Sequence, residues 1–291
     1  MLKIAVVANC QARPIAFLLE NALDNVQVIT IAIVHLLKNE QAKEYEKHFE
    51  DADFVITQKI ADSYPCEFIH TTKLRKVYGH KIIEIPNLFY RGYNPELRYY
   101  RIPEKGTLTG PLGDYHNELI FNCWAQGGTV TSALKALNDE DIWADKYSFV
   151  AEQSLLELSN REKELDIEVS DILQEKVDKK RLFYTFNHPC LEMLLEVVKR
   201  ISVLLSRKLK LTFNTSNLAE PLNQFYVPIS PHAARIIGFN LDNDTVVNCR
   251  GLKKNVHGQY SVRGFYSIPE LIEEFFKNYD DNRKLIHAKL L

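Results

Sequence analysis

The first part of the chain alternates short apolar runs with segments whose apolar residues recur at helical spacing. The β-branched and apolar runs predict strands at residues 2–8, 26–34, 54–57 and 81–85. The segments between them predict helices at residues 13–23, 38–49 and 72–78. Strands that alternate with helices need crossover connections. The pattern therefore predicts an α/β fold with an open, mostly parallel, doubly wound sheet that is covered by helices on both faces.

The pattern changes after residue 85. Residues 86–111 have no regular period and are rich in aromatic residues, Pro, Gly and Arg, which predicts an ordered loop over a site. Further elements are predicted as helices at 114–125, 129–137, 143–165, 190–206 and 269–279, and as a strand at 182–186. We expect residues 1–206 to form an α/β catalytic domain and residues 207–291 to form a C-terminal extension packed on it.

Composition narrows the class of protein. The 291 residues are 46% hydrophobic, and 36 Lys and Arg face 38 Asp and Glu, so a soluble globular protein without general attraction to nucleic acid is expected. The five cysteines show no C-x-x-C pair, which argues against a disulfide framework or a zinc site, and no metal is expected. No apolar stretch has the length of a signal sequence or a membrane span, so we expect a cytoplasmic protein. The sequence leaves a homo-oligomer open.

Cys10 lies between the first predicted strand and the first predicted helix, in the sequence Ala8-Asn9-Cys10-Gln11. Open α/β sheets bind ligands at the carboxyl ends of their strands, and the following helix points its N–H groups there. A thiol in that position is expected to have a lowered pKa and partial thiolate character. The structural alternative is a buried cysteine at a strand end.

Two histidines have a comparable setting. His116 falls in the first turn of the helix predicted from Asp114, which is suited to cap that helix. His188 follows the strand at 182–186 as Cys10 follows the first strand, so thiol and imidazole would converge if both strands join one sheet. Each has a structural alternative, namely a histidine bonded to a carbonyl at a helix start, or a His-Pro pair at a helix cap.

The loop at 86–111 carries groups suited to an anionic ligand. Asn87 follows a predicted strand and can donate a hydrogen bond to an oxyanion. Arginines can bind phosphates and tyrosines can stack on a ring, and the candidates are Tyr90, Arg91, Arg98 and Arg101. The alternative is an aromatic loop that only covers the core.

Four segments occur together in a recognisable order. They are Asn9-Cys10-Gln11, the stretch from Pro86 to Pro95, Gly113-Asp114-Tyr115-His116, and Asn187-His188-Pro189. In this order they resemble the WcbI-like family of capsular polysaccharide biosynthesis proteins, over residues 4–206. The resemblance implies an acetyltransferase that binds coenzyme A and decorates a bacterial surface glycan. Ala8 stands where the family has Gly.

Acyl transfer from acetyl-CoA to a sugar hydroxyl requires a base, donors for the oxyanion and a cleft for the nucleotide. His188 is the preferred base because it directly follows a predicted strand and precedes the helix that begins at Pro189, and His116 is the second candidate. Cys10 either accepts the acetyl group or lines the pocket where the CoA sulfur arrives. Candidates for oxyanion or substrate contacts are Asn9, Gln11, Asn87, Asp114 and Asn187, and candidates for CoA contacts are Tyr90, Arg91, Arg98 and Arg101.

Two other function classes use the same residues. An SGNH-type esterase, with an SGNH-like version of the open sheet, would transfer the acyl group to water. A nucleotide- or glycan-binding module would leave Cys10 and His188 structural. Sulfotransfer is disfavoured because the chain lacks a G-x-x-x-x-G-K phosphate loop.

Overall fold

The computed structural model describes residues 1–103, 105–206, 218–244 and 247–289, which group into two compact units. Unit 1 comprises residues 1–89, 155–175 and 188–221, and unit 2 comprises residues 90–154, 176–187 and 222–291. The units are therefore not the successive segments 1–206 and 207–291 expected from the sequence, because the chain passes between them several times. Residues 207–217, with which the expected second segment begins, lie outside the described residues.

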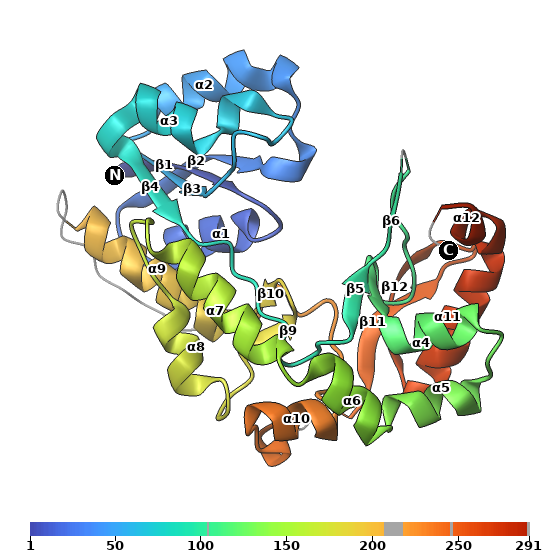
Figure 1. Cartoon of the computed structure of the whole chain (residues 1–291). Coiled ribbons are helices and arrows are strands. Elements are labelled where there is room, and N and C mark those ends of the chain that lie inside the picture. Colours follow the sequence, from blue (N-terminus) through green and yellow to red (C-terminus); the bar gives the residue numbers. More distant parts are fainter. Residues whose placement is uncertain (104, 207–217, 245–246, 290–291) are drawn as a thin grey trace. The chain divides into compact units, whose positions relative to one another are not determined.

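Unit 1 is built on a four-stranded parallel sheet in the order β2-β1-β3-β4 (Figure 1). The strands are β1 (Leu2–Ala8), β2 (Val26–Ile33), β3 (Phe54–Gln58) and β4 (Ile82–Ile85). The crossover helices are α1 (Ala12–Ala22), α2 (Ala42–Asp51) and α3 (Thr71–Tyr78). Helix α1 covers one face of the sheet while α2 and α3 cover the other. This confirms the predicted open, parallel α/β fold.

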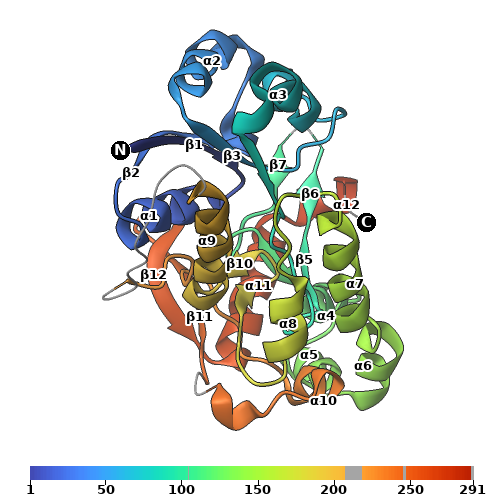
Figure 2. The same ribbon diagram turned by 90° about the vertical axis from the view of Figure 1, so that its left-hand side faces the viewer.

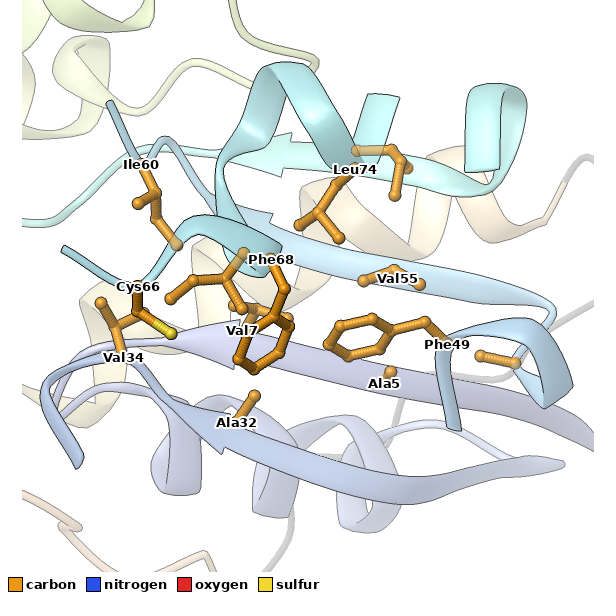
Figure 3. Packing of buried hydrophobic residues seen from close by; sticks show 13 residues of the cluster. Ala5, Val7, Ala32, Val34, Phe49, Val55, Ile60, Cys66, Phe68 and Leu74 are labelled. Atoms are coloured by element: carbon orange, nitrogen blue, oxygen red, sulfur yellow. The ribbon is translucent and has the colours of Figure 1, made fainter. Parts of the chain in front are cut away.

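A hydrophobic cluster lies between the sheet and helices α2 and α3 (Figure 3). Ala5 and Val7 on β1 and Val55 on β3 meet Phe49 from α2 and Leu74 from α3. Leu2, Ile4, Val6 and Ala8 are buried on the opposite face, so the strand is apolar along almost its whole length, as is typical of a central parallel strand. This packing fixes the carboxyl end of β1, after which Asn9 and Cys10 follow.

Unit 1 also contains helices outside the sheet crossovers, namely α8 (Ser170–Lys176), α9 (Leu191–Leu205) and residues 155–162 of a helix that begins in unit 2. Helix α9 lies beside α1 in both views of the molecule (Figures 1 and 2). Its buried residues recur at helical spacing, as the sequence predicted: Met193, Leu194, Val197, Val198, Ile201 and Leu205. Helix α8 precedes it. Short 3₁₀ turns are at Val34–Leu36, Asn39–Gln41, Glu67–Ile69, Gly79–Lys81 and, in unit 2, Leu241–Asn243.

Unit 2 combines short antiparallel ribbons with helices. The ribbons pair β5 (Leu97–Tyr99) with β8 (Tyr115–Asn117), β6 (Arg101–Ile102) with β7 (Gly106–Thr107), and β11 (Cys249–Lys254) with β12 (Tyr260–Tyr266). The helices are α4 (Glu118–Ala125), α5 (Val130–Leu137), α6 (Glu140–Tyr147), α10 (Pro231–Ile237), α11 (Ile268–Asp281) and α12 (Arg283–Lys289). Its core is aromatic, with the buried Tyr279 packed on Phe275 and Phe121.

Three predicted elements differ from the structure. The helix expected from Asp114 begins at Glu118, because Asn117 caps it and the preceding residues pair with β5. The helix expected over 143–165 is two helices, α6 and α7 (Val150–Glu162), separated at residues 148–149. Strand β9 (Phe183–Thr185) and the two-residue β10 (His188–Pro189) lie outside the four-stranded sheet.

No helix in the described ranges is long and apolar enough to cross a membrane.

Candidate functional site

Polar residues that follow the strands of unit 1 meet at the carboxyl edge of its sheet. Asn9 and Cys10 follow β1, Gln58 ends β3, and Asn87 lies two residues after β4. The chain leaves β1 toward β2 on one side and leaves β3 toward β4 on the other, while β1 and β3 are neighbours. Such a reversal of strand order opens a crevice, and open α/β folds bind ligands there.

Two buried glutamines hold the loops at this edge together. The Gln11 Oε1 accepts hydrogen bonds from Gln58 Nε2 at 2.8 Å and from the Leu88 N–H at 3.3 Å, and Gln11 Nε2 donates to the Leu88 carbonyl at 2.8 Å. Gln58 Oε1 accepts from the Asn9 N–H at 2.9 Å. Because these amides are buried and hydrogen-bonded, Gln11 positions the loops at this edge.

Asn9 connects the thiol with a second asparagine. Its Oδ1 accepts from the Gln11 N–H at 2.9 Å and from the Cys10 thiol at 3.8 Å, and its Nδ2 donates to Asn87 Oδ1 at 2.9 Å. The side chain of Asn87 is exposed, and no acceptor within the described part of the chain takes its Nδ2. Asn87 therefore presents an oriented amide donor at the edge that carries the thiol.

The Cys10 thiol does not have the lowered pKa expected from its position. It is half-buried, and burial raises its pKa to about 11, although its own backbone N–H lowers the value. Helix α1 begins at Ala12, and the Gln11 N–H before it is taken by Asn9 Oδ1. The loss of solvation on burial raises the thiol pKa more than the helix N-terminus lowers it, so the predicted thiolate character is wrong.

His188 lies in unit 1, as Cys10 does. The strand before it, β9, is not part of the four-stranded sheet, so convergence through a shared sheet is wrong. The ring is half-buried, and burial lowers its pKa to about 4, which keeps the imidazole neutral. Its neighbour Asn187 belongs to unit 2, where its Oδ1 accepts from Tyr115 Oη at 2.5 Å.

His116 lies in the core of unit 2, on β8 and not in a helix. Its ring is fully buried, with Nδ1 at 3.0 Å from Tyr279 Oη and Nε2 at 2.8 Å from the Leu108 carbonyl. Burial lowers its pKa to about 4. With both nitrogens occupied, His116 fits the structural alternative. Asp114 is exposed and accepts from Thr109 at 3.5 Å, and it does not cap helix α4.

Two residues assigned to CoA binding are committed to unit 2 itself. The Arg98 guanidinium donates to the carbonyls of Pro95 and Leu97, at 2.5 and 2.8 Å, and pairs with Glu118 at 2.9 Å. Tyr90 is buried, with its ring edge-on to another aromatic ring, so no nucleotide base can stack on it. Arg98 and Tyr90 therefore support the fold of the loop rather than a phosphate or a base.

Arg91 and Arg101 are the other two arginines assigned to CoA binding. Arg91 is half-buried and donates to the Pro95 carbonyl at 3.1 Å. Arg101 is exposed on β6, and its position leaves the guanidinium accessible to an anion. Within the described ranges, no three His, Cys, Asp or Glu side chains are placed to hold a metal ion.

Sequence patterns did not indicate Gln58, although it joins the Asn9 and Gln11 loops. The prediction ended the third strand at residue 57. The available signal was a polar residue directly after the apolar run Phe54–Thr57, at the carboxyl end of a strand next to β1.

The parallel sheet defines an open α/β protein, and its polar, thiol-bearing edge lies at the strand reversal where such folds bind ligands. The chain belongs to the WcbI family of polysaccharide biosynthesis enzymes, whose sequence model matches residues 3–208. A solved structure of WcbI shares the fold, with a TM-score of 0.68 and 19% identity, over 99% of this chain and 97% of the other. It is described as the native protein without a disulfide bond between coenzyme A and one of its cysteines. No curated protein matches.

Proposed function

We propose that this protein is an acetyltransferase that moves the acetyl group of acetyl-CoA to a sugar hydroxyl in the synthesis of a surface polysaccharide. Its family consists of polysaccharide biosynthesis enzymes, and the solved WcbI structure is described in terms of coenzyme A and a cysteine. The observation that carries the proposal is the link from Cys10 through Asn9 to the exposed amide of Asn87. Acetyl-CoA and a glycan are then the two small-molecule partners.

Asn87 is suited to stabilise the negative charge of the reaction. When the sugar hydroxyl attacks the thioester carbonyl, a tetrahedral intermediate forms with its charge on the former carbonyl oxygen. Asn9 holds the Asn87 oxygen at 2.9 Å and so orients the Nδ2 group outward. A donor that is already oriented loses little free energy to reorganisation during the reaction.

His188 is the proposed base that accepts the proton of the sugar hydroxyl. Its lowered pKa, about 4, keeps the ring neutral and able to accept a proton across the neutral range. A base with this pKa is weak. The reaction therefore requires the pKa to rise as negative charge develops beside the ring, which is the expected effect of a nearby anion.

Cys10 is proposed to line the pocket for the CoA sulfur rather than to carry the acetyl group. A thiol with a pKa of about 11 is almost entirely protonated at neutral pH, and the thiolate is the nucleophilic form. Direct transfer needs no such nucleophile. The released CoA thiolate takes up the proton that leaves the sugar hydroxyl, so the step is balanced without another reactant.

The release of CoA thiol from acetyl-CoA, followed with a chromogenic thiol reagent, tests the proposal. The reaction is run with and without a panel of sugars, and the sugar product is examined for added acetyl by mass spectrometry. A transferase releases thiol only when an accepting sugar is present. Release without sugar indicates an esterase that uses water, and no release together with CoA binding indicates a binding module; either result overturns the proposal.

A further inference from the structure

Unit 2 contains a cavity of about 240 Å³ that no residue of the proposed site lines. It lies among β5, α4, α5, α6, the segment 227–231 and the start of α11. Its walls are mostly apolar, with Leu97, Ile120, Leu134, Trp143, Ile229 and Leu271 among them. An engineered apolar cavity of about 150 Å³ holds a benzene molecule in another protein, so this one has room for a ring with a short chain.

A single carboxyl group lines this apolar space at Glu96. The side chain is only 4% exposed, and its Oε2 has no hydrogen-bond partner within the described ranges. The backbone carbonyl of Glu96 accepts from the Glu118 N–H at 2.9 Å, which fixes the residue at the wall. A buried carboxyl oxygen without a partner costs free energy, and a ligand that brings a donor recovers it.

The cations near Glu96 are committed to other carboxylates. Arg98 and Arg181 both favour the ionised form of Glu96, yet Arg98 pairs with Glu118 at 2.9 Å and Arg181 with Asp244 at 3.1 Å. Burial raises the pKa of Glu96 to about 7 and outweighs these two charges as well as the hydrogen bonds from the Glu96 backbone and the Asn94 side chain. The other titratable groups whose charge interacts with Glu96 are Tyr147 and Cys249.

We propose that this cavity is a second ligand site, which takes a small apolar amine, or an apolar substituent that ends in an amine, with its ammonium group on Glu96 Oε2. The apolar walls take the body of the ligand and the carboxylate takes the charged end, which is the usual division of roles in a small-molecule site. A hydrocarbon leaves the Oε2 without a donor, and a carboxylate ligand is repelled. The inference goes beyond the proposed acetyl transfer and does not depend on it.

Four probes of one shape test the site: 2-phenylethylamine, 2-phenylethanol, ethylbenzene and 3-phenylpropionate. Their binding to the full chain is measured by calorimetry or ligand-observed NMR at pH 6 and pH 8. Glu96 is about one-tenth ionised at pH 6 and about nine-tenths ionised at pH 8 for a pKa of about 7. The amine, charged at both values, should bind up to about tenfold tighter at pH 8. The alcohol and the hydrocarbon should show no such change.

Three variants separate the carboxylate from the cavity. Glu96→Gln keeps the shape of the side chain and should weaken binding of the amine at least tenfold without affecting binding of ethylbenzene. Glu140→Gln, which changes an exposed carboxylate on α6, is the matched control and should have no effect. Leu134→Trp fills the cavity and should abolish binding of the amine and the hydrocarbon.

Thermal unfolding of each variant checks that it is folded. Amine binding that is no stronger than that of ethylbenzene, or that is unchanged in Glu96→Gln, overturns the proposal. Equal binding of the alcohol and the amine at both pH values contradicts the proposal that the ligand binds through an ammonium group. Binding of none of the probes indicates a space filled by water only and also overturns it.

Discussion

The reactivity of Cys10 distinguishes direct transfer from a covalent acetyl-enzyme. Its pKa is raised from 9.0 to about 11, because the half-buried thiol loses water when it ionises. Each pKa unit changes the thiolate fraction tenfold, so the folded protein should hold about a hundredfold less Cys10 thiolate at pH 8 than the unfolded chain. At that pH the thiolate fraction is about 0.1% in the folded state and about 10% in the unfolded state.

Limiting iodoacetamide with quantification of each cysteine by mass spectrometry measures this difference. The same thiol in urea is the control, since it has the same neighbours in sequence but is solvated. We expect Cys10 to be alkylated about a hundredfold more slowly in the folded protein at pH 8, with a rate that still rises at pH 10. Alkylation of folded Cys10 as fast as in urea, with an apparent pKa below about 8.5, refutes this reasoning and favours a nucleophilic thiolate.

Three further predictions follow from the site and from the core of unit 2. Asn87→Ala should lower kcat about 10²- to 10³-fold, which is the usual effect of losing one oxyanion donor. The melting temperature should not change, because the Asn87 side chain is exposed. As a control, Asn138→Ala, at an exposed asparagine in unit 2, should leave kcat unchanged. Gln58→Leu should destabilise the protein by about 1–3 kcal/mol in urea unfolding, because it leaves the Asn9 N–H without its acceptor and removes one of the two donors to Gln11 Oε1. An unchanged midpoint contradicts that role. The pKa of His116 falls from 6.5 to about 4 on folding, so the unfolded chain binds a proton more readily than the folded protein. The free energy of unfolding should therefore decrease by about 3 kcal/mol as the pH drops from about 6.5 to about 4. A His116→Phe variant should lose that part of the slope, and its persistence would show that another group causes it.

The sequence predicts the parallel sheet because its signal is local. Central strands such as β1 are apolar along almost their whole length, and crossover helices such as α1 show a buried stripe, so both can be predicted from one window of residues. The same locality places Asn9 after β1 and Asn87 after β4, and the two meet at the carboxyl edge of the sheet although β3 lies between their strands.

Long-range contacts decide what the sequence could not predict. Asp114 looked like a helix cap, but pairing of β8 with β5 moves the start of the helix, and Asn117 takes the cap. The local sequence around His116 is typical of a catalytic histidine, but in the structure Tyr279, far along the chain, occupies its Nδ1. The pKa of Cys10 depends on burial by the whole unit, which no local pattern records.

A crystal structure of the protein with coenzyme A tests the central claim most directly. The site at the end of β1 predicts the CoA sulfur in contact with Cys10 Sγ, and the Asn87 Nδ2 facing the position of the thioester carbonyl. The Asn87→Ala protein, crystallised in the same way, should keep the sulfur in place, because Asn87 is proposed to act on the reaction rather than on binding. A CoA sulfur bound away from Cys10 and Asn87 would contradict the account.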